Sequence, residues 1–326
     1  MLKRGIVSLD QLDRPLTWLG KKKHANLLLL ADLFRQPAPD ARHYDTIISQ
    51  VITPNGTWKE SCTDRFATLD RLTLATLAER WPGRRQLVIT DLGASSGATS
   101  VQLFQLLRER FSLDFLATDL CRDAIAVRPR YAKWVIVFDA DGRALQHVFS
   151  AFVLPGQGQE SALYPINRAL RALSRRLLVP KAAAVFSRCD ARTLADFETI
   201  AVDRYKITKI PLLSYHCLRL LRECQQFRFE VVDVMQPLSR CADVIRVMNV
   251  LTPVYFDEAR LRAGIGNCAA ALNPGGLLIL GRSPMEDPAN AKATIYLNDA
   301  GAIRPLHRLN GGYEAHHLVE GTRAAA

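Results

Sequence analysis

The sequence predicts a doubly wound α/β fold in which a mostly parallel sheet of seven strands is covered by helices. Two observations carry this prediction. Short runs rich in Val, Ile and Leu alternate with segments of helical spacing, as expected of strands buried on both faces and of the helices that join them. The last two strand-like runs flank a short turn at residues 298–301, which indicates that the sheet ends in an antiparallel hairpin.

The length of the chain is compatible with one large domain or two smaller ones. It has 326 residues, of which 48% are hydrophobic and 23% charged, as in ordinary globular proteins. We expect a helical region over residues 1–84 and an α/β domain over residues 85–326. An insertion over residues 134–205 is expected to interrupt this second domain.

Charge, cysteines and apolar runs limit the class of protein further. Lys and Arg outnumber Asp and Glu by 43 to 32, a net charge of +11 that permits an anionic partner. The arginines are spread along the chain without an RNA-binding motif, so nucleic acid is not expected. The seven cysteines form no C-x-x-C pair, which predicts reduced thiols and no metal site. No signal peptide opens the chain and no run approaches the ~18 apolar residues that span a bilayer, so a cytoplasmic location is expected.

Before the sheet, amphipathic patterns predict helices over residues 26–34 and 64–81, separated by loops rich in Pro and Asn-Gly. The first core strand follows with the apolar run Leu87, Val88 and Ile89, and Asp91 closes it. After this strand, Asp91 to Gly97 (DLGASSG) form a glycine-containing turn into a helix. Glycine lets the backbone approach a ligand closely, and a helix N-terminus offers unpaired N–H donors and partial positive charge. A nucleotide or a cofactor with a carboxylate is therefore expected here, although the spacing of the glycines disfavours NAD and FAD.

The second core strand is expected at residues 113–120 (LDFLATDL), and it ends at Asp119. An acid in this position of a doubly wound fold accepts hydrogen bonds from ribose hydroxyls, and a carboxylate can accept from both at once. Asp123 is interpreted instead as the cap of a following helix.

The insertion is expected to begin with a β-hairpin, in which residues 134–138 and 144–149 flank the turn D-A-D-G. Residues 162–178 predict a basic amphipathic helix, and residues 194–202 and 212–224 two further helices. The basic helix is either an ordinary surface helix or a docking face for an acidic partner or a membrane surface. Its basic residues are Arg168, Arg171, Arg175 and Arg176.

After the insertion the α/β pattern resumes. Asp257 is expected to start a helix that extends to residue 272, and N-P-G-G then turns into another strand. The remaining five strands are expected at residues 227–234, 243–251, 277–281, 294–297 and 302–306.

Together these patterns resemble the class I S-adenosylmethionine (SAM)-dependent methyltransferases, and within them most closely the chemoreceptor glutamate methyltransferases of the CheR type. The resemblance covers about residues 86–284. The motifs that this chain shares with the CheR type are A-S-S-G, A-T-D-L, D-V-M, N-V-L followed by Y-F-D, and L-N-P-G-G-L-L-I-L-G-R-S. The CheR type also carries a small β insertion after its second strand. Met248 stands where that type has the arginine of a C-R-N triplet, so we expect a related enzyme with another acceptor.

The resemblance implies a Rossmann-like fold, with SAM bound across the carboxyl ends of the strands and S-adenosylhomocysteine (SAH) as product. It implies transfer of the methyl group to a small molecule or a protein side chain. Asn249 and Tyr255 are expected near the reacting methyl, with a strand-end hydrogen bond and a packed aromatic ring as their structural alternatives. The residues expected to contact SAM are Asp91, Gly93, Ala94, Ser95, Gly97, Asp119, Leu120, Asp233, Val234, Asn249 and Val250.

Two alternatives stay open. The letters G-A-S-S-G also satisfy G-x-S-x-G, which would make Ser95 a hydrolase nucleophile with His307, His316 or His317 as its base. That fold needs earlier strands and an oxyanion loop, and residues 1–80 show neither. The other alternative is a catalytically inactive SAM-binding scaffold that binds a partner through its basic insertion.

Overall fold

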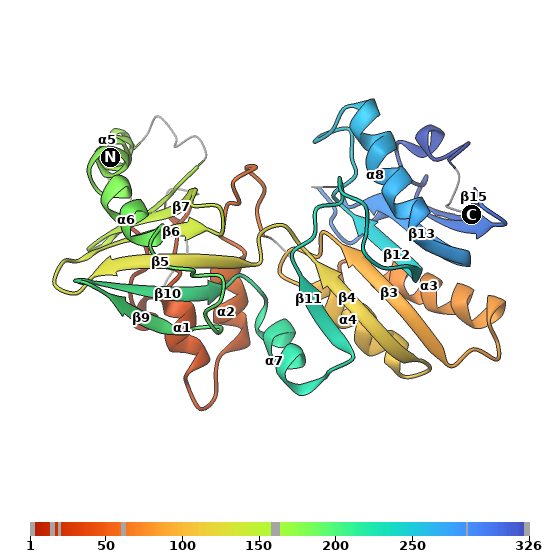
Figure 1. Cartoon of the computed structure of the whole chain (residues 1–326), viewed down its shortest axis with the longest axis horizontal. Helices are drawn as coiled ribbons and strands as arrows, with labels where there is room; N and C mark the ends of the chain where they lie inside the picture. Colours follow the sequence, from red (N-terminus) through yellow and green to blue (C-terminus); the bar gives the residue numbers. More distant parts are fainter. Residues whose placement is uncertain are drawn as a thin grey trace. The chain divides into compact units, whose positions relative to one another are not determined.

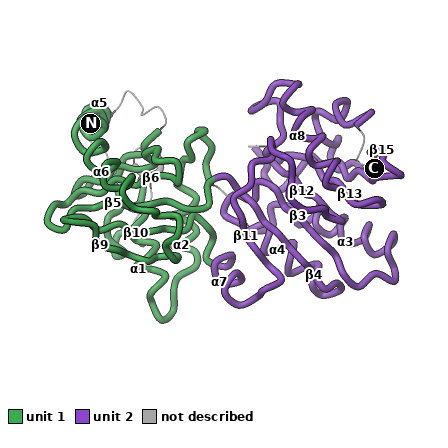
Figure 2. Tube along the Cα trace, viewed as in Figure 1, with its two compact units in different colours: residues 1–60, 121–215 green, residues 61–120, 216–326 purple. Residues whose placement is uncertain are grey.

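The computed structural model describes residues 4–13, 17–18, 21–59, 63–157, 164–284 and 286–322. The chain forms two compact units, each assembled from two separate stretches of sequence (Figures 1 and 2). Unit 1 contains residues 1–60 and 121–215, and unit 2 contains residues 61–120 and 216–326.

Unit 2 is built on a seven-stranded sheet with the order β11-β4-β3-β12-β13-β14-β15. The strands from β11 to β13 run parallel, and β14 and β15 close the sheet as antiparallel neighbours. This confirms the predicted α/β fold with a mostly parallel sheet and a terminal hairpin. The strands are β3 (Gln86–Leu92), β4 (Ser112–Thr118), β11 (Phe227–Glu230), β12 (Ala242–Met248), β13 (Leu272–Arg282), β14 (Lys292–Asp299) and β15 (Ala302–Leu309).

Helices connect the parallel strands of this sheet, as right-handed crossovers require. Helix α4 joins β3 to β4, and α8 joins β12 to β13. Asp257 caps α8 as predicted, because its side chain accepts the N–H of Arg260 at 2.9 Å. The helices of unit 2 are α3 (Ala67–Arg80), α4 (Ala98–Arg108), α7 (Tyr215–Glu223), α8 (Glu258–Ala270) and the short 3-10 helix η2 (His316–Leu318).

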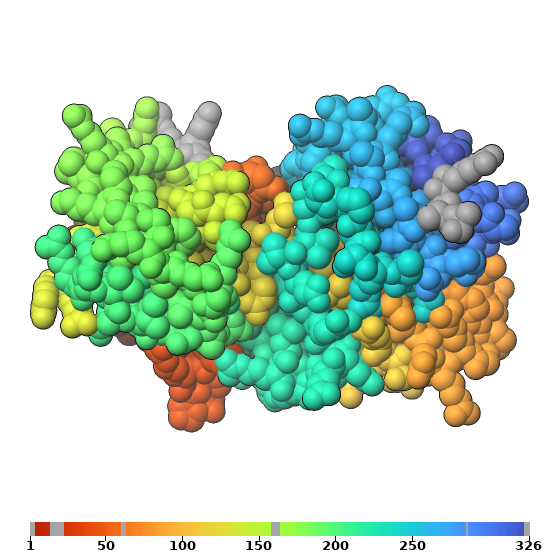
Figure 3. Space-filling model, viewed as in Figure 1, coloured from red at the N-terminus to blue at the C-terminus, as the bar shows by residue number. Residues whose placement is uncertain are grey.

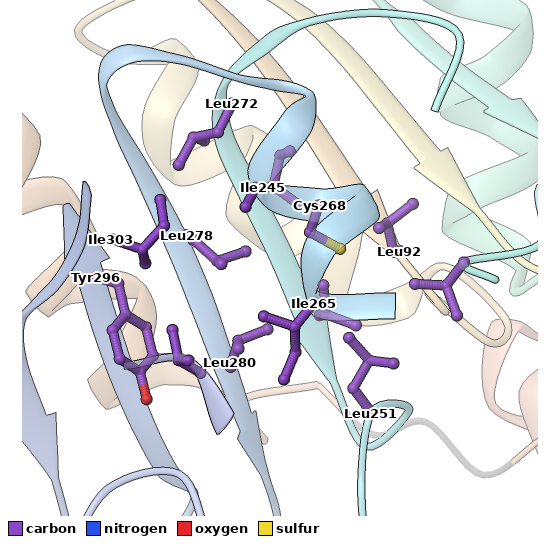
Figure 4. Close-up of a cluster of buried hydrophobic side chains, with 14 of the residues drawn as sticks. Leu92, Ile245, Leu251, Ile265, Cys268, Leu272, Leu278, Leu280, Tyr296 and Ile303 are labelled. Atoms are coloured by element: carbon purple, nitrogen blue, oxygen red, sulfur yellow. The ribbon is translucent and has the colours of Figure 1, made fainter. Parts of the chain in front are cut away.

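A hydrophobic cluster fixes α8 to the sheet (Figure 4). Ile265 and Cys268 of α8 pack over aliphatic side chains of β12 and β13, among them Ile245 and Leu278. Because this face of the sheet is closed by side chains, ligands must approach unit 2 at the ends of its strands, as is usual for open α/β sheets.

Unit 1 is built on a six-stranded antiparallel sheet with the order β8-β7-β6-β5-β10-β9. A separate two-stranded ladder pairs β1 (Thr17–Trp18) with β2 (Lys21–Lys22). The strands of the large sheet are β5 (Asp123–Pro129), β6 (Trp134–Asp139), β7 (Ala144–Phe149), β8 (Phe152–Pro155), β9 (Thr199–Val202) and β10 (Tyr205–Pro211). Its helices are η1 (Leu9–Gln11), α1 (Leu29–Phe34), α2 (Ala41–Ile48), α5 (Pro165–Leu177) and α6 (Val179–Phe186).

The structure confirms the predicted hairpin as β6 and β7, and the predicted basic helix as α5, although residues 162–163 lie outside the described residues. Two local predictions are wrong. Asp123 does not cap a helix but begins β5, where its carboxylate pairs with Arg122 at 2.5 Å. Residues 194–202 do not form a helix, because Thr199–Val202 pair with β10 as the edge strand β9.

The two units also differ from the predicted division at residue 84. The N-terminal region joins unit 1 through long-range hydrogen bonds: the Gln146 amide accepts from Leu27 N at 3.1 Å and donates to Ala25 O at 2.7 Å. The insertion begins before residue 134, because β5 pairs with β10 along its whole length, from Pro129 opposite Tyr205 to Asp123 opposite Pro211. Within the described residues, no helix has both the length and the apolar character needed to cross a membrane.

Candidate functional site

The loop after β3 lies at the carboxyl edge of the sheet in unit 2. Gly93, Ser95 and Gly97 all adopt positive φ angles, of 72°, 57° and 78°. The N–H of Ala94 donates to the carbonyl of Thr118 in β4 at 2.7 Å, and Gly97 N–H donates to Ala94 O at 2.8 Å. The chain therefore turns sharply from β3 into α4 while it stays fixed to β4. Ser95, which is not a glycine, holds a left-handed conformation, and such strained residues are frequent at ligand sites.

Packing within the protein explains both glycines. A Cβ atom on Gly93 would lie 2.0 Å from Cγ2 of Val250, and one on Gly97 would lie 2.5 Å from Sγ of Cys217 in α7. Atoms cannot approach so closely, so any larger residue would push the loop away from the end of β12 or from α7. The two glycines therefore bring the predicted residues Gly93 and Val250 into contact and place the start of α4 at the sheet edge.

Asp119, directly after β4, connects this loop to a third strand. Its Oδ2 accepts the N–H of Ser95 at 2.9 Å, and its own N–H donates to the carbonyl of Glu230, at the end of β11, at 3.2 Å. The residue is partly exposed. Because a carboxylate offers about four acceptor positions, Asp119 can accept hydroxyl groups of a ligand while it holds Ser95.

Two aliphatic side chains next to Asp119 are exposed to solvent. Leu120 is 60% exposed and Val231, directly after β11, is 58% exposed. They follow neighbouring parallel strands, so they lie at the same edge of the sheet. Exposed aliphatic groups beside a hydrogen-bonding carboxylate suit a ligand with a flat apolar ring and a hydroxyl-bearing part.

Leu120 was among the predicted residues, whereas Val231 was missed. The run FRFEVVDV was interpreted as one strand, but β11 already ends at Glu230. Asp233 instead closes a turn by accepting the N–H of Met235 at 2.9 Å, and Val234 is buried in the hydrophobic core. In the structure Val231 is exposed and Val232 packs against the hydrophobic core, and the apolar run VV gave no signal in the sequence for an earlier end of the strand.

Asp91 is buried rather than directed at the sheet edge. Its two oxygens accept from Nε and Nη2 of Arg246 at 2.9 and 2.5 Å, and the hydroxyl of Ser100 in α4 also donates to it at 2.5 Å. Arg246 in turn donates to Asp70 of α3 at 2.8 Å. Asp91 thus ties β3 to β12 and to α4 below the loop, where it can position the site. The lone arginine in the apolar run DVIRVMNVL was the sequence signal for this buried ion cluster.

Burial raises the pKa of Asp70 to about 6, with Arg246 acting in the opposite direction and Asp91 in the same one. A single arginine, Arg246, forms ion pairs with the carboxylates of both Asp70 and Asp91, and all three side chains are buried. Such a cluster stabilises only while its cation is present, since an unpaired buried charge is costly.

Asn249 lies at the carboxyl edge, as expected, with a positive φ of 61°. Its Oδ1 accepts the N–H of Ser283 at 2.7 Å and its N–H donates to Gly281 O at 2.9 Å, so one role is to join β12 to β13. Its Nδ2 donates no hydrogen bond to any described residue. Tyr255 lies in the following turn, where the residue is 51% exposed and its N–H donates to Thr252 O at 3.0 Å.

A hydrolase site at Ser95 lacks support in the described part of unit 2. Before β3 that part contains α3 and no strand, whereas the hydrolase fold needs an earlier strand and its oxyanion loop. His307 is on β15, four strand spacings or about 19 Å from β3. His316 and His317 belong to η2, which packs against α8. In the described residues no three His, Cys, Asp or Glu side chains are grouped to bind a metal ion.

No family model and no curated protein matches the chain. Several solved structures resemble it weakly. CalS10, an amino pentose methyltransferase from Micromonospora echinaspora, has 12% identity over 79% of this chain and 81% of its own, with a TM-score of 0.31. The N-methyltransferase NodS from Bradyrhizobium japonicum, solved with SAH, has 16% identity over 78% of this chain and 71% of its own, with a TM-score of 0.31.

The cyclase SpnF has 13% identity over 65% of this chain and a TM-score of 0.28, and the match spans only 44% of SpnF. Values this low assign no function, which therefore has to be inferred from the residues of this chain.

Proposed function

We propose that the protein is a SAM-dependent methyltransferase whose cofactor site is the carboxyl edge of the sheet in unit 2. The observation that carries this proposal is the juxtaposition at the ends of β3, β4 and β11. There Asp119 accepts the N–H of Ser95 in the glycine-containing loop, and the exposed side chains of Leu120 and Val231 flank it.

The chemistry of these groups fits SAM in three parts. The carboxylate of Asp119 can accept both ribose hydroxyls. Leu120 and Val231 offer apolar surface to the adenine ring. The first turn of α4 provides N–H donors and partial positive charge for the carboxylate of the methionine part. When bound, SAM would supply an electrophilic methyl group on a sulfonium, so the protein has to supply mainly position and exclusion of water.

Asn249 and Tyr255 are the residues that we propose to orient the acceptor. Both follow β12, Asn249 directly before Val250, which contacts Gly93 of the loop, and Tyr255 in the next turn. Each carries a polar group that could contact a second substrate. We propose a small molecule or a protein side chain as that acceptor, and the chemoreceptor glutamate suggested by the CheR resemblance stays a prediction.

Calorimetric titration of the full-length protein with SAM and with SAH tests the proposal. We expect saturable binding, weakened at least tenfold by Asp119→Asn and by Leu120→Asp. The Asn oxygen can still accept the N–H of Ser95, so Asp119→Asn removes a ribose acceptor without freeing the loop. Asp114→Asn, an exposed position on the same strand, is the control and is expected to leave binding unchanged. Absence of binding to the folded protein, or unchanged affinity in Asp119→Asn, contradicts the proposal.

Substitutions at the two acceptor-side residues separate catalysis from structure, with SAH release from a panel of acceptors as the readout. Asn249→Asp retains an oxygen for the N–H of Ser283 but loses the Nδ2 donor. We expect it and Tyr255→Phe to lower turnover at unchanged SAM affinity. If Asn249→Asp is fully active and Asn249→Ala unfolds, the residue has only a structural role.

The two alternatives give different results in the same assays. A SAM-binding scaffold binds SAM but releases no SAH with any acceptor, and its favouring observation is the basic unit described below. A serine hydrolase is labelled by a fluorophosphonate in the wild type and not in Ser95→Ala.

A further inference from the structure

Folding concentrates the positive charge in one unit, although the sequence spreads its arginines along the chain. Unit 1 has 24 Lys and Arg against 14 Asp and Glu, a net charge of +10. Unit 2 has 19 against 18, a net charge of +1. The proposed cofactor site belongs to the nearly neutral unit, so the charge of unit 1 calls for a separate explanation.

Helix α5 of unit 1 buries polar residues and exposes apolar ones, unlike an ordinary amphipathic helix. Such helices normally turn their apolar stripe to the protein interior. Helix α5 belongs to the light green region at the surface of unit 1 (Figure 3). Its buried residues are the polar Asn167 and Ser174, whereas Ile166, Leu173 and Leu177 are 48%, 54% and 48% exposed. At 3.6 residues per turn, these three side chains form one stripe that lies about a quarter turn from the buried face.

The other exposed side of α5 is strongly basic. Arg168, Arg171, Arg175 and Arg176 border a shallow surface hollow, and Ala169 and Ala172 complete its lining. The helix contains no Asp or Glu. Arg168 and Arg176 form no ion pair with any described residue, and Arg175 donates to the carbonyl of Gly156 at 2.5 Å. An anionic group in this hollow would meet several arginines, and α5 itself has no carboxylate that would compete for them.

We infer that α5 binds an anionic membrane surface, with its apolar stripe at the level of the upper acyl chains and its arginines on the lipid phosphates. This inference is independent of the proposed methyl transfer. A helix that lies in the lipid interface can immerse its apolar stripe, while its long arginine side chains reach back to the phosphates around it. Nucleic acid would neutralise the arginines but leave Ile166, Leu173 and Leu177 in water. A membrane also needs no groove beside the stripe, and the hollow found here lies on the basic side.

The test is sedimentation of the full-length protein with vesicles of phosphatidylcholine alone or mixed with phosphatidylglycerol. We expect binding to the anionic vesicles only, weakened by salt. Arg168→Glu with Arg176→Glu is expected to reduce binding at least tenfold, and Leu173→Ser with Leu177→Ser to reduce it several-fold. The control is Arg71→Glu with Arg80→Glu, which changes the net charge equally at exposed positions of α3 in unit 2 and is expected to bind like the wild type.

Each other outcome overturns the inference. If the wild type does not bind anionic vesicles, α5 has no membrane role. If the α3 control loses as much binding as the α5 variant, the attraction is a general effect of net charge. If the leucine variant binds normally and RNA or an acidic polypeptide displaces the vesicles from the same arginines, the partner is a polyanion. Circular dichroism of every variant verifies folding, which these exposed positions are not expected to affect.

Discussion

The two units place their charged groups in opposite ways. Unit 2 buries Arg246 between Asp70 and Asp91 below the proposed cofactor loop, and its total charge is close to zero. Unit 1 carries nearly all of the net charge, and the arginines of α5 border a hollow at its surface. A buried cation held by carboxylates is not available to a partner, and its removal is costly because the carboxylates stay buried without it. Exposed cations contribute little to folding and remain available for binding.

The largest expected effect is on the buried cluster. Arg246→Met leaves the carboxylates of Asp70 and Asp91 buried without a cation, which is expected to cost about 3–5 kcal/mol of unfolding free energy. Urea denaturation followed by hydrogen exchange is expected to show β3 and β12 of unit 2 opening first, with unit 1 unaffected. The control Arg262→Met removes an exposed arginine paired with Glu258 at 2.7 Å and is expected to cost under about 0.5 kcal/mol. Equal losses in the two variants would contradict the contrast between buried and exposed charges.

Gly93→Ala should have the next largest effect, because its Cβ would overlap Val250 and the residue has a positive φ. We expect a loss of about 1–3 kcal/mol, together with loss of SAM binding, since the loop must move away from β12. Adding Val250→Ala removes the overlapping methyl groups and is expected to recover part of the stability. A single variant as stable as the wild type would show that the loop tolerates displacement.

The units are also expected to respond to pH in opposite directions. Burial, with a further effect of Arg175 and Arg171, lowers the pKa of His147 in unit 1 from 6.5 to about 4. The unfolded chain therefore binds the proton first, and unit 1 loses stability as the pH falls from 6.5 towards 4. In unit 2 the folded state holds the proton of Asp70 more tightly, because burial raises that pKa from 3.8 to about 6. Protonated Asp70 therefore contributes to the stability of unit 2 fully below pH 3.8, and this contribution is lost as the pH rises through about 6.

Urea denaturation with hydrogen exchange at several pH values between 4 and 7 tests this opposition. His147→Gln is expected to flatten the pH dependence of unit 1 alone, and Asp70→Asn that of unit 2 alone. The assignment fails if either variant leaves the profile of its own unit unchanged.

The smallest effect is expected for Arg168→Ala with Arg176→Ala. Both side chains are exposed and unpaired among the described residues, so unfolding free energy should change by less than about 0.5 kcal/mol. SAM affinity should also be unchanged, since the proposed site lies in unit 2. A large destabilisation would assign these arginines to the fold and weaken the case for a membrane role.

Local patterns predicted the parts of unit 2 that depend on neighbouring residues. The apolar run of β3, the turn through Gly93 and Gly97, and the terminal hairpin were all visible in the sequence. Asp119 was selected for its position at a strand end, and the structure places it against Ser95. These features follow from alternation of strand and helix and from turn residues, which act over short distances.

Unit 1 was predicted poorly because its sheet depends on contacts far apart in the sequence. β5 pairs with β10, some 80 residues later, and Gln146 binds the backbone around Ala25. No local pattern in Asp123–Pro129 distinguished a strand from a helix before its partner was known. The burial of Asp91 was missed for a similar reason, since only the register of β3 and β12 places Arg246 directly opposite it.

Hydrogen–deuterium exchange of the full-length protein with and without SAH tests the central claim most directly, because it reports on both units at once. We predict slower exchange in the loop at residues 93–97 and at residues 119–120, with no change in α5 of unit 1. The assignment of the cofactor site to unit 2 would be contradicted if SAH slowed amide exchange only in unit 1. It would also be contradicted if saturating SAH left exchange at the carboxyl edge of the sheet in unit 2 unchanged.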